Sequence, residues 1–278
     1  MPVRPWGLVS SILLLRLTLA FIIGGGWVTF ITWVAERRGA ELGGFFGGLP
    51  STSAFAFLFI GWIESTSAAV DATTSFPMFM SFTGAFVLVY AFFARWGFVA
   101  GLTTALSVWF FAALLITLSS PGFDISILGC TFVSLATYYG LRKLGLRSPR
   151  PTPAAYPRCL RILRFLISGG IIVVAVLASE VGGPIFGAVF SAFPAIFTST
   201  LYTVSRSEGT EFSRGMATSL MLSAILTVIP YSIAVRYLYP GLGIWYGTLA
   251  AYAVAIPIGV VYYRYGRSWL LGSAPRAD

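Results

Sequence analysis

Stretches of about 20 mostly apolar residues recur along the whole chain, the length that a helix needs to cross a bilayer core. Each stretch ends at charged residues, glycine or proline. Because 57% of the residues are hydrophobic and only 10% are charged, a soluble fold would lack the polar surface that it needs. We therefore predict an all-α, polytopic membrane protein with nine transmembrane helices, over residues 15–35, 42–63, 72–94, 97–118, 124–141, 160–179, 184–205, 213–237 and 242–264.

The first apolar run, from Leu8 to Val34, is too long for the hydrophobic region of a signal peptide and contains Arg16. We expect its second half to stay in the protein as a membrane span.

The basic residues predict the orientation. With the N-terminus outside the cell, all but three of the 18 Lys and Arg residues fall in cytoplasmic segments, the exceptions being Arg4, Arg16 and Arg236. Cytoplasmic loops of membrane proteins carry an excess of such residues. We therefore expect a multi-pass protein of the cell membrane, with its N-terminus outside and its C-terminus in the cytoplasm. The basic connection over residues 142–158 is expected to contact anionic membrane lipids.

The sequence lacks the residues that several kinds of protein chemistry need. The chain contains no histidine, and its two cysteines are Cys130 in an apolar run and Cys159 at the end of the basic linker, directly after residue 158. This excludes histidine general bases and gives no pattern for a disulfide framework or a zinc site. A phosphate-binding loop and an aromatic-basic pattern for nucleic acid are also missing from the sequence. We expect no cofactor, no metal, no nucleic-acid partner and no enzymatic activity.

Four of the six glutamates form two pairs at one spacing. Glu36 and Glu64 are matched, 144 positions later, by Glu180 and Glu208. At this offset residues 36–97 also share glycine, phenylalanine, threonine, serine and proline identities, among them Pro50 with Pro194 and Thr83 with Thr227. A repeated pattern that includes costly membrane carboxylates indicates a duplicated unit.

The helix expected at 124–141 has no counterpart and would turn the second unit upside down in the membrane. We therefore predict inverted-topology repeats arranged as 4+1+4 helices. The predicted boundaries are 1–118 for the first four-helix repeat, 119–159 for the reversing helix and basic cytoplasmic linker, and 160–278 for the second four-helix repeat.

The second and seventh predicted helices carry glycines and a proline in the apolar stretch. Pro50 and Pro194 are each followed by hydroxyl residues, which include Ser53 and Thr198. Proline removes a helical hydrogen bond, and broken helices at matching positions of two repeats are typical of a transporter's substrate site. The alternative interpretation is that the small residues only allow tight helix packing around a tolerated kink.

The acids have two interpretations each. Glu64 and Glu208 stand at predicted helix ends, where they either reach water and cap the next helix or bind a proton or a cation. Glu36 is next to Arg37 and Arg38, which favours an interfacial role. Glu180 lies among small residues, and for it a binding role is harder to dismiss.

The run from Gly43 to Pro50, continued to Glu64, and its partner from Gly187 to Pro194, continued to Glu208 and Thr210, resemble small four-helix bacterial membrane proteins of the GlpM-like family. That family has a glycine-rich segment ending in Leu-Pro and a later Glu-Thr-Gly-Asp turn, whose final Gly-Asp is absent here. The resemblance covers most of each half and implies two such units fused through a reversing helix. The family's function is unknown, so the resemblance implies no substrate.

We predict a secondary transporter or exporter of a small molecule or ion, coupled to protons or cations, with alternating access between the repeats. Its expected partners are membrane lipids and the substrate. The sequence does not decide whether the protein forms a homo-oligomer. The alternative is a non-transporting lipid-binding or assembly protein, whose repeat provides only packing. The predicted substrate- or proton-binding residues are Glu64, Glu208, Glu180, Glu36, Pro50, Pro194, Ser53 and Thr198.

Overall fold

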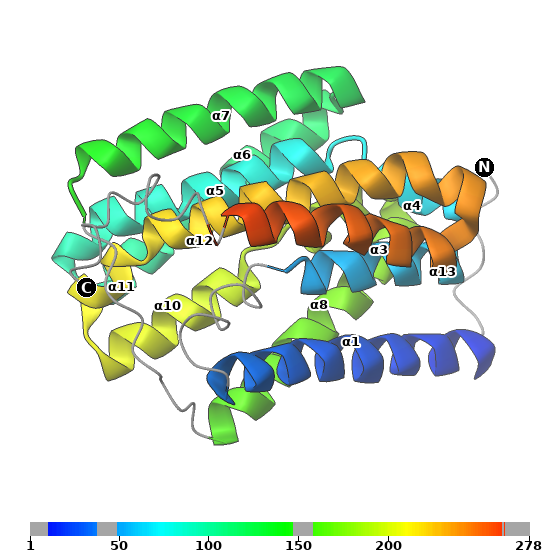
Figure 1. Cartoon of the computed structure of the whole chain (residues 1–278), viewed down its shortest axis with the longest axis horizontal. Helices are drawn as coiled ribbons and strands as arrows, with labels where there is room; N and C mark the ends of the chain where they lie inside the picture. Colours follow the sequence, from blue (N-terminus) through cyan, green and yellow to red (C-terminus); the bar gives the residue numbers. More distant parts are fainter. Residues whose placement is uncertain (1–10, 38–48, 147–157, 263, 265–278) are drawn as a thin grey trace.

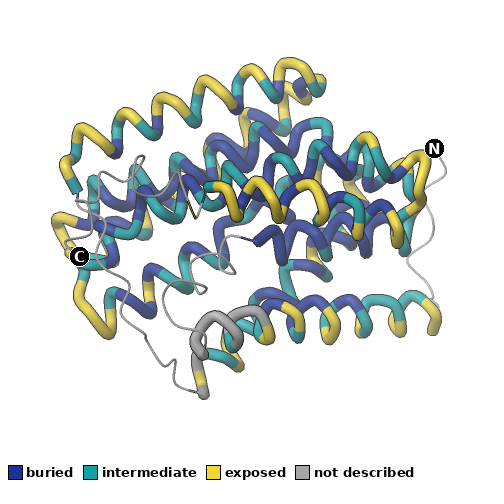
Figure 2. The backbone as a smooth tube through the Cα atoms, in the orientation of Figure 1, coloured by how far each residue is buried: buried dark blue, intermediate teal, exposed yellow. Residues whose placement is uncertain are grey.

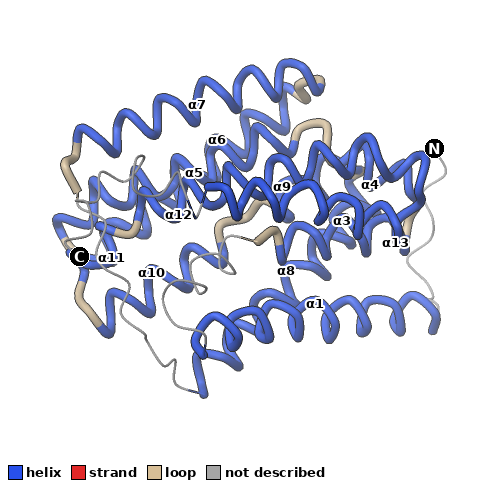
Figure 3. Tube along the Cα trace, viewed as in Figure 1, coloured by secondary structure: helices blue, strands red, loops and turns tan. Residues whose placement is uncertain are grey.

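The structure, a computed structural model, describes residues 11–37, 49–146, 158–262 and 264, and these residues form helices without strands (Figures 1 and 3). In chain order the elements are α1 (Ser11–Arg37), α3 (Ser51–Ile63), α4 (Thr66–Ala72), α5 (Phe76–Phe93), η1 (Ala94–Trp96), α6 (Phe98–Ser119), α7 (Phe123–Lys143), α8 (Arg158–Gly182), α9 (Pro184–Ser191), α10 (Ala195–Ser207), α11 (Thr210–Gly215), α12 (Ala217–Ser223), η2 (Ala224–Val228) and α13 (Ile229–Val261).

Seven segments of the described residues are long and apolar enough to cross a membrane. This confirms the all-helical class and is consistent with a polytopic membrane protein. The predicted number of nine differs from seven for two reasons. Part of the predicted helix 42–63 lies outside the described residues, and the predicted helices 213–237 and 242–264 fall in one continuous run, 210–261.

That run contains a sharp change of direction at Gly243, whose positive φ of 69° interrupts the helical backbone inside α13. Such a conformation is open to glycine at little cost. The segments on either side pack on each other, and the Tyr239 and Thr248 hydroxyls form a hydrogen bond of 2.7 Å between them. A Cβ atom on Gly247 would lie 2.6 Å from the Tyr239 ring, so the glycine permits this contact.

A second interruption divides the membrane-length segment 184–207 into α9 and α10. Pro194 is the N-cap of α10, and Pro50 is the N-cap of α3. Both helices have 13 residues, and both ends of α10 lie 144 positions after those of α3. Figure 1 shows that α3 and α10 extend from the middle of the molecule toward opposite ends.

Helices α1 and α8 cross at two glycines in a reciprocal contact. A Cβ atom on Gly25 of α1 would lie 2.7 Å from the carbonyl oxygen of Phe165, and one on Gly169 of α8 would lie 2.7 Å from the carbonyl oxygen of Phe21. The Phe21 and Phe165 rings meet edge to face with centroids 5.3 Å apart. Each of these residues on α8 is 144 positions after its counterpart on α1.

The core lies around α5, which packs against α6, α7, α9 and α12. Phe57, Phe76, Phe79 and Tyr90 are fully or almost fully buried there. The outer faces of α6, α7 and the last part of α13 expose large apolar side chains, among them Leu118, Phe132 and Leu249. Figure 2 shows this division between a buried interior and exposed faces on the outer helices. An apolar outer surface of this kind suits contact with lipid.

Candidate substrate site

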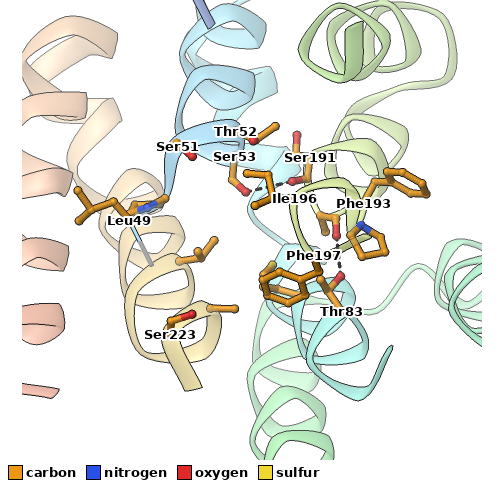
Figure 4. Close-up of a pocket in the computed structure, with 16 residues that line it drawn as sticks. Leu49, Ser51, Thr52, Ser53, Thr83, Ser191, Phe193, Ile196, Phe197 and Ser223 are labelled. Carbon is orange, nitrogen blue, oxygen red and sulfur yellow. Dashed lines mark hydrogen bonds between the residues drawn. The ribbon is translucent and has the colours of Figure 1, made fainter. Parts of the chain in front are cut away.

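A cavity of about 60 Å³ lies where α3 begins and where the chain breaks between α9 and α10 (Figure 4). Residues 49–53 form one wall and the break around Pro194 forms the facing wall. Side chains from α5, α12 and η2 complete it. The lining residues are Leu49, Pro50, Ser51, Thr52, Ser53, Met80, Thr83, Ser191, Ala192, Phe193, Pro194, Ile196, Phe197, Ser223, Ala224 and Val228.

The carbonyl groups of the α9–α10 break all accept hydrogen bonds. Ser53 of α3 donates to the Ser191 carbonyl oxygen (3.0 Å), and Thr83 of α5 donates to that of Ala192 (2.6 Å). Two backbone amides donate to the next two carbonyls, from Ala195 to Phe193 and from Thr198 to Pro194, both at 2.8 Å. A buried carbonyl without a donor is costly, so these bonds stabilise an unwound backbone inside the molecule.

The carbonyl groups of residues 49 and 50, directly before α3, also accept hydrogen bonds. The Tyr252 hydroxyl of α13 donates to the Pro50 carbonyl oxygen at 2.9 Å, and the Ser51 amide donates to that of Leu49 at 2.7 Å. The backbone directly before α3 and the α9–α10 break are therefore both held by donors that come partly from distant helices.

Thr83 connects the break to a third helix. Besides donating to Ala192, its hydroxyl oxygen accepts a hydrogen bond of 2.9 Å from the indole nitrogen of Trp109 on α6. Thr83 is 2% exposed and Trp109 is 1% exposed. The ring of Trp109 also meets that of Phe193, with centroids 5.3 Å apart. The position of the break thus depends on a buried network joining α5, α6 and the segment before α10.

The N-termini of α3 and α10 both lie at the cavity, because it is lined by residues 51–53 at the start of α3 and by Pro194, Ile196 and Phe197 at the start of α10. The first amides of a helix lack intrahelical acceptors, and the helix dipole makes this end positive. Neither helix has a side-chain cap among the described residues. Thr52, in the first turn of α3, is nine-tenths buried, and its hydroxyl oxygen has no hydrogen-bond partner in the described part of the chain.

The acids form a separate cluster at the other end of α3. Glu64 is the C-cap of α3, and its half-buried carboxyl lies near Ser179 and Glu180 of α8. Burial raises the pKa of Glu64 from 4.5 to about 7, with the Ser179 hydroxyl opposing this rise and the negative charge of Glu180 adding to it. Since 13 helical residues span about 20 Å, this cluster stands apart from the cavity.

The structure therefore brings the predicted site residues together in two groups. Pro50, Ser53 and Pro194 line the cavity. Thr198 is one turn further along α10 and outside the lining, although its hydroxyl oxygen is buried without a partner in the described residues. Glu64 and Glu180 lie close together across the two halves.

The other two predicted acids join neither group. Glu208 is the exposed C-cap of α10. Glu36 falls within α1, and its side chain lies outside the described residues. Arg214, six residues after Glu208, pairs with Glu211 at 2.5 Å.

Sequence reasoning missed Thr83, Ser191 and Thr52 as residues of the cavity. Thr83 recurs as Thr227 at the repeat spacing, so a signal for it was present. Ser191 and Thr52 stand within three residues of the two prolines, and only their contacts distinguish them from neighbouring hydroxyl residues.

Comparison of the chain with models of known protein families, with curated proteins and with solved structures finds no match. The resemblance to GlpM-like proteins stays a prediction.

Proposed function

We propose that the protein is a secondary membrane transporter or exporter of a small molecule or ion, working by alternating access between two inverted repeats. The observation that carries this proposal is that Pro50 and Pro194, 144 positions apart, meet at one cavity where α3 and α10 begin. Discontinuous helices at matching positions of two repeats form the substrate sites of many secondary transporters. Unwound backbone inside a membrane is otherwise costly, and it is tolerated where it is buried in protein or lines a cavity.

Three features support the inverted repeats. Helices α3 and α10 have matching ends and extend in opposite directions from the middle of the molecule (Figure 1). The crossing of α1 and α8 is reciprocal at Gly25 and Gly169, as expected for a pseudo-twofold axis between them. In the proposed arrangement the chain crosses the membrane nine times, with residue 243 at a reversal, the N-terminus outside and the C-terminus in the cytoplasm.

We assign coupling to the cluster of Glu64 and Glu180 at the proposed outer face. Glu64 is half-buried and one of its carboxyl oxygens has no hydrogen-bond partner among the described residues. Two carboxyl groups that share a site favour protonation of one of them. The charged group on α1 at this end is Arg16, whose guanidinium reaches the Trp62 carbonyl oxygen at 3.5 Å and lies 5.5 Å from the Trp62 ring centroid.

Flux measurements in vesicles test this function. The purified protein should move solute across the vesicle membrane at a rate that depends on pH with a midpoint near 7, because the Glu64 carboxyl is mostly neutral below that pH and charged above it. Glu64→Gln should abolish the pH dependence and lower coupled flux at least tenfold, since the amide cannot release a proton.

Glu211→Gln provides the matched control, because Glu211 is an exposed glutamate paired with Arg214. It should leave the pH profile unchanged. Panels of labelled cations, anions and small neutral metabolites, each with and without a pH gradient, would identify a transported class. Absence of flux for every class, with correctly folded protein in the vesicles, would refute the transporter proposal.

A further inference from the structure

Most hydroxyl groups around the cavity already donate their hydrogen to the backbone. Ser53 and Thr83 donate to carbonyl oxygens of the α9–α10 break, and Figure 4 shows these bonds as dashed lines. The hydroxyls of Ser191 and Ser223 donate at 2.7 and 2.9 Å, each to the carbonyl oxygen one turn before it in its own helix. A hydroxyl oxygen that donates its hydrogen still has lone pairs. The serines among these lining residues can therefore accept hydrogen bonds from an occupant of the cavity.

The hydroxyl of Ser51, at the start of α3, is not committed in this way. Ser51 lines the cavity, and its hydroxyl forms no hydrogen bond with another described residue. The Thr52 hydroxyl oxygen also lacks a partner in the described residues, but it is fully enclosed, whereas the Ser51 oxygen is not. The Ser51 hydroxyl can therefore both donate to an occupant and accept from it.

A full charge finds no counter-charge in this cavity. Among the described residues that line it, none carries a charged side chain. The N-termini of α3 and α10 make the space electrically positive, which disfavours a cation. The first amides of these two helices already donate to the carbonyls of Leu49 and Phe193, so they are not available to an anion. Because a charge that leaves water is costly without a partner, we expect the occupant to be neutral.

The rest of the lining and the volume limit the occupant further. Apolar side chains, among them Leu49, Met80 and Phe197, form much of the wall. The volume of about 60 Å³ gives room for roughly four to six water-sized groups, because one water needs about 10 to 15 Å³ of such space. Sites for drug-sized ligands have several hundred Å³. The cavity therefore suits a molecule of about five non-hydrogen atoms that is partly apolar.

We infer that the cavity binds a small uncharged molecule with one hydrogen-bonding head group, an alcohol or a primary amide, and a short apolar tail. The inference rests on the proposed function and names the substrate class of that site. The head group accepts from the Ser51 hydroxyl and donates to the hydroxyl oxygens of Ser53 or Ser223. The tail contacts the apolar part of the wall.

Three compounds of matched size separate the charge classes, because propionamide is neutral, propionate is an anion and butylammonium is a cation. Saturation-transfer NMR of the full-length protein in detergent measures their binding. Propionamide should bind saturably, with the weak affinity of so small a ligand, and neither ion should do so. Saturable binding of either ion with comparable affinity, or lack of saturable propionamide binding by the folded protein, would overturn the inference.

Ser223→Leu tests whether the ligand occupies the cavity. The larger side chain should fill part of the space and lower propionamide affinity about tenfold or more, since protein interiors leave little spare volume. Ser199→Leu is the matched control, because Ser199 lies outside the lining and its hydroxyl also donates to the carbonyl oxygen one turn before it, at 3.0 Å. This control should bind like the parent protein. Parent-like binding by Ser223→Leu would refute the site.

Ser51→Ala tests the hydroxyl with a small change of shape. It should weaken propionamide binding about three- to tenfold, as expected for the loss of one neutral hydrogen bond. Thr52→Val should leave the affinity unchanged, because the hydroxyl that it removes is enclosed. Size-exclusion profiles and thermal unfolding check that each variant is folded. Parent-like affinity of Ser51→Ala would contradict the inferred binding mode.

These binding measurements do not require transport, so the two proposals can fail separately. Propionamide binding that depends on Ser51, without flux of any solute, would support this site and refute the transport proposal. Flux of an ion, with no propionamide binding by the same protein, would retain the transport proposal and refute the neutral site.

Discussion

Thr83→Val should destabilise the protein by about 2 kcal/mol or more, because it leaves two buried polar groups without a partner. The first is the Ala192 carbonyl, which accepts from the Thr83 hydroxyl at 2.6 Å, and the second is the indole N–H of Trp109, which donates to it at 2.9 Å. Valine has almost the shape of threonine, so packing should change little. Thermal unfolding in detergent measures the loss.

Thr83→Ser distinguishes the hydroxyl from the rest of the side chain. Serine keeps the donor and the acceptor, and we expect it to unfold at a temperature close to that of the parent protein. Equal destabilisation by valine and serine would show that the network does not hold the break between α9 and α10.

Gly25→Ala and Gly169→Ala should each destabilise the crossing of α1 and α8, by about 1 to 3 kcal/mol, because overpacking forces a backbone shift. The added Cβ atom would lie 2.7 Å from a backbone carbonyl oxygen in both cases, that of Phe165 or that of Phe21. A carbonyl oxygen cannot move aside as the tip of a flexible side chain can. Because the two contacts mirror each other, the two losses should be similar.

The neighbouring glycines are controls with the same change of residue. A Cβ atom on Gly26 or Gly170 would meet no atom within 4 Å. Alanine favours a helix over glycine by about 1 kcal/mol, so Gly26→Ala and Gly170→Ala should leave stability equal or higher. A marked loss at only one of Gly25 and Gly169 would contradict the reciprocal crossing.

The sequence contained enough to predict where α3 and α10 begin, because proline lacks an amide hydrogen and fixes its own backbone. Pro50 and Pro194 were predicted as the positions of helix breaks; they are the N-caps of α3 and α10, and the predicted helical segment before Pro50 lies outside the described residues. The hydroxyl residues after them were predicted as a class. Which of them lines the cavity depends on packing against α5, α12 and η2, and of the predicted Ser53 and Thr198 only Ser53 belongs to the lining.

The contacts between distant segments could not be predicted in the same way. The donors to the broken backbone include Thr83 on α5 and Tyr252 on α13, which are far from the breaks in the sequence. The closeness of Glu64 to Ser179 and Glu180 likewise arises from packing between the two halves. Local patterns in the sequence give the position of a helix end, and they do not give the residue opposite it.

The opposite orientation of the two halves is the central claim, and labelling of single cysteines tests it most directly. Ser67 and Glu211 are both exposed and are separated by the repeat spacing of 144 residues. Each would be replaced by cysteine in a background with Cys130→Ser and Cys159→Ser. A maleimide that does not cross membranes should label Ser67→Cys in intact cells, and Glu211→Cys only after the cells are opened. Labelling of both from the same side would contradict the inverted repeats.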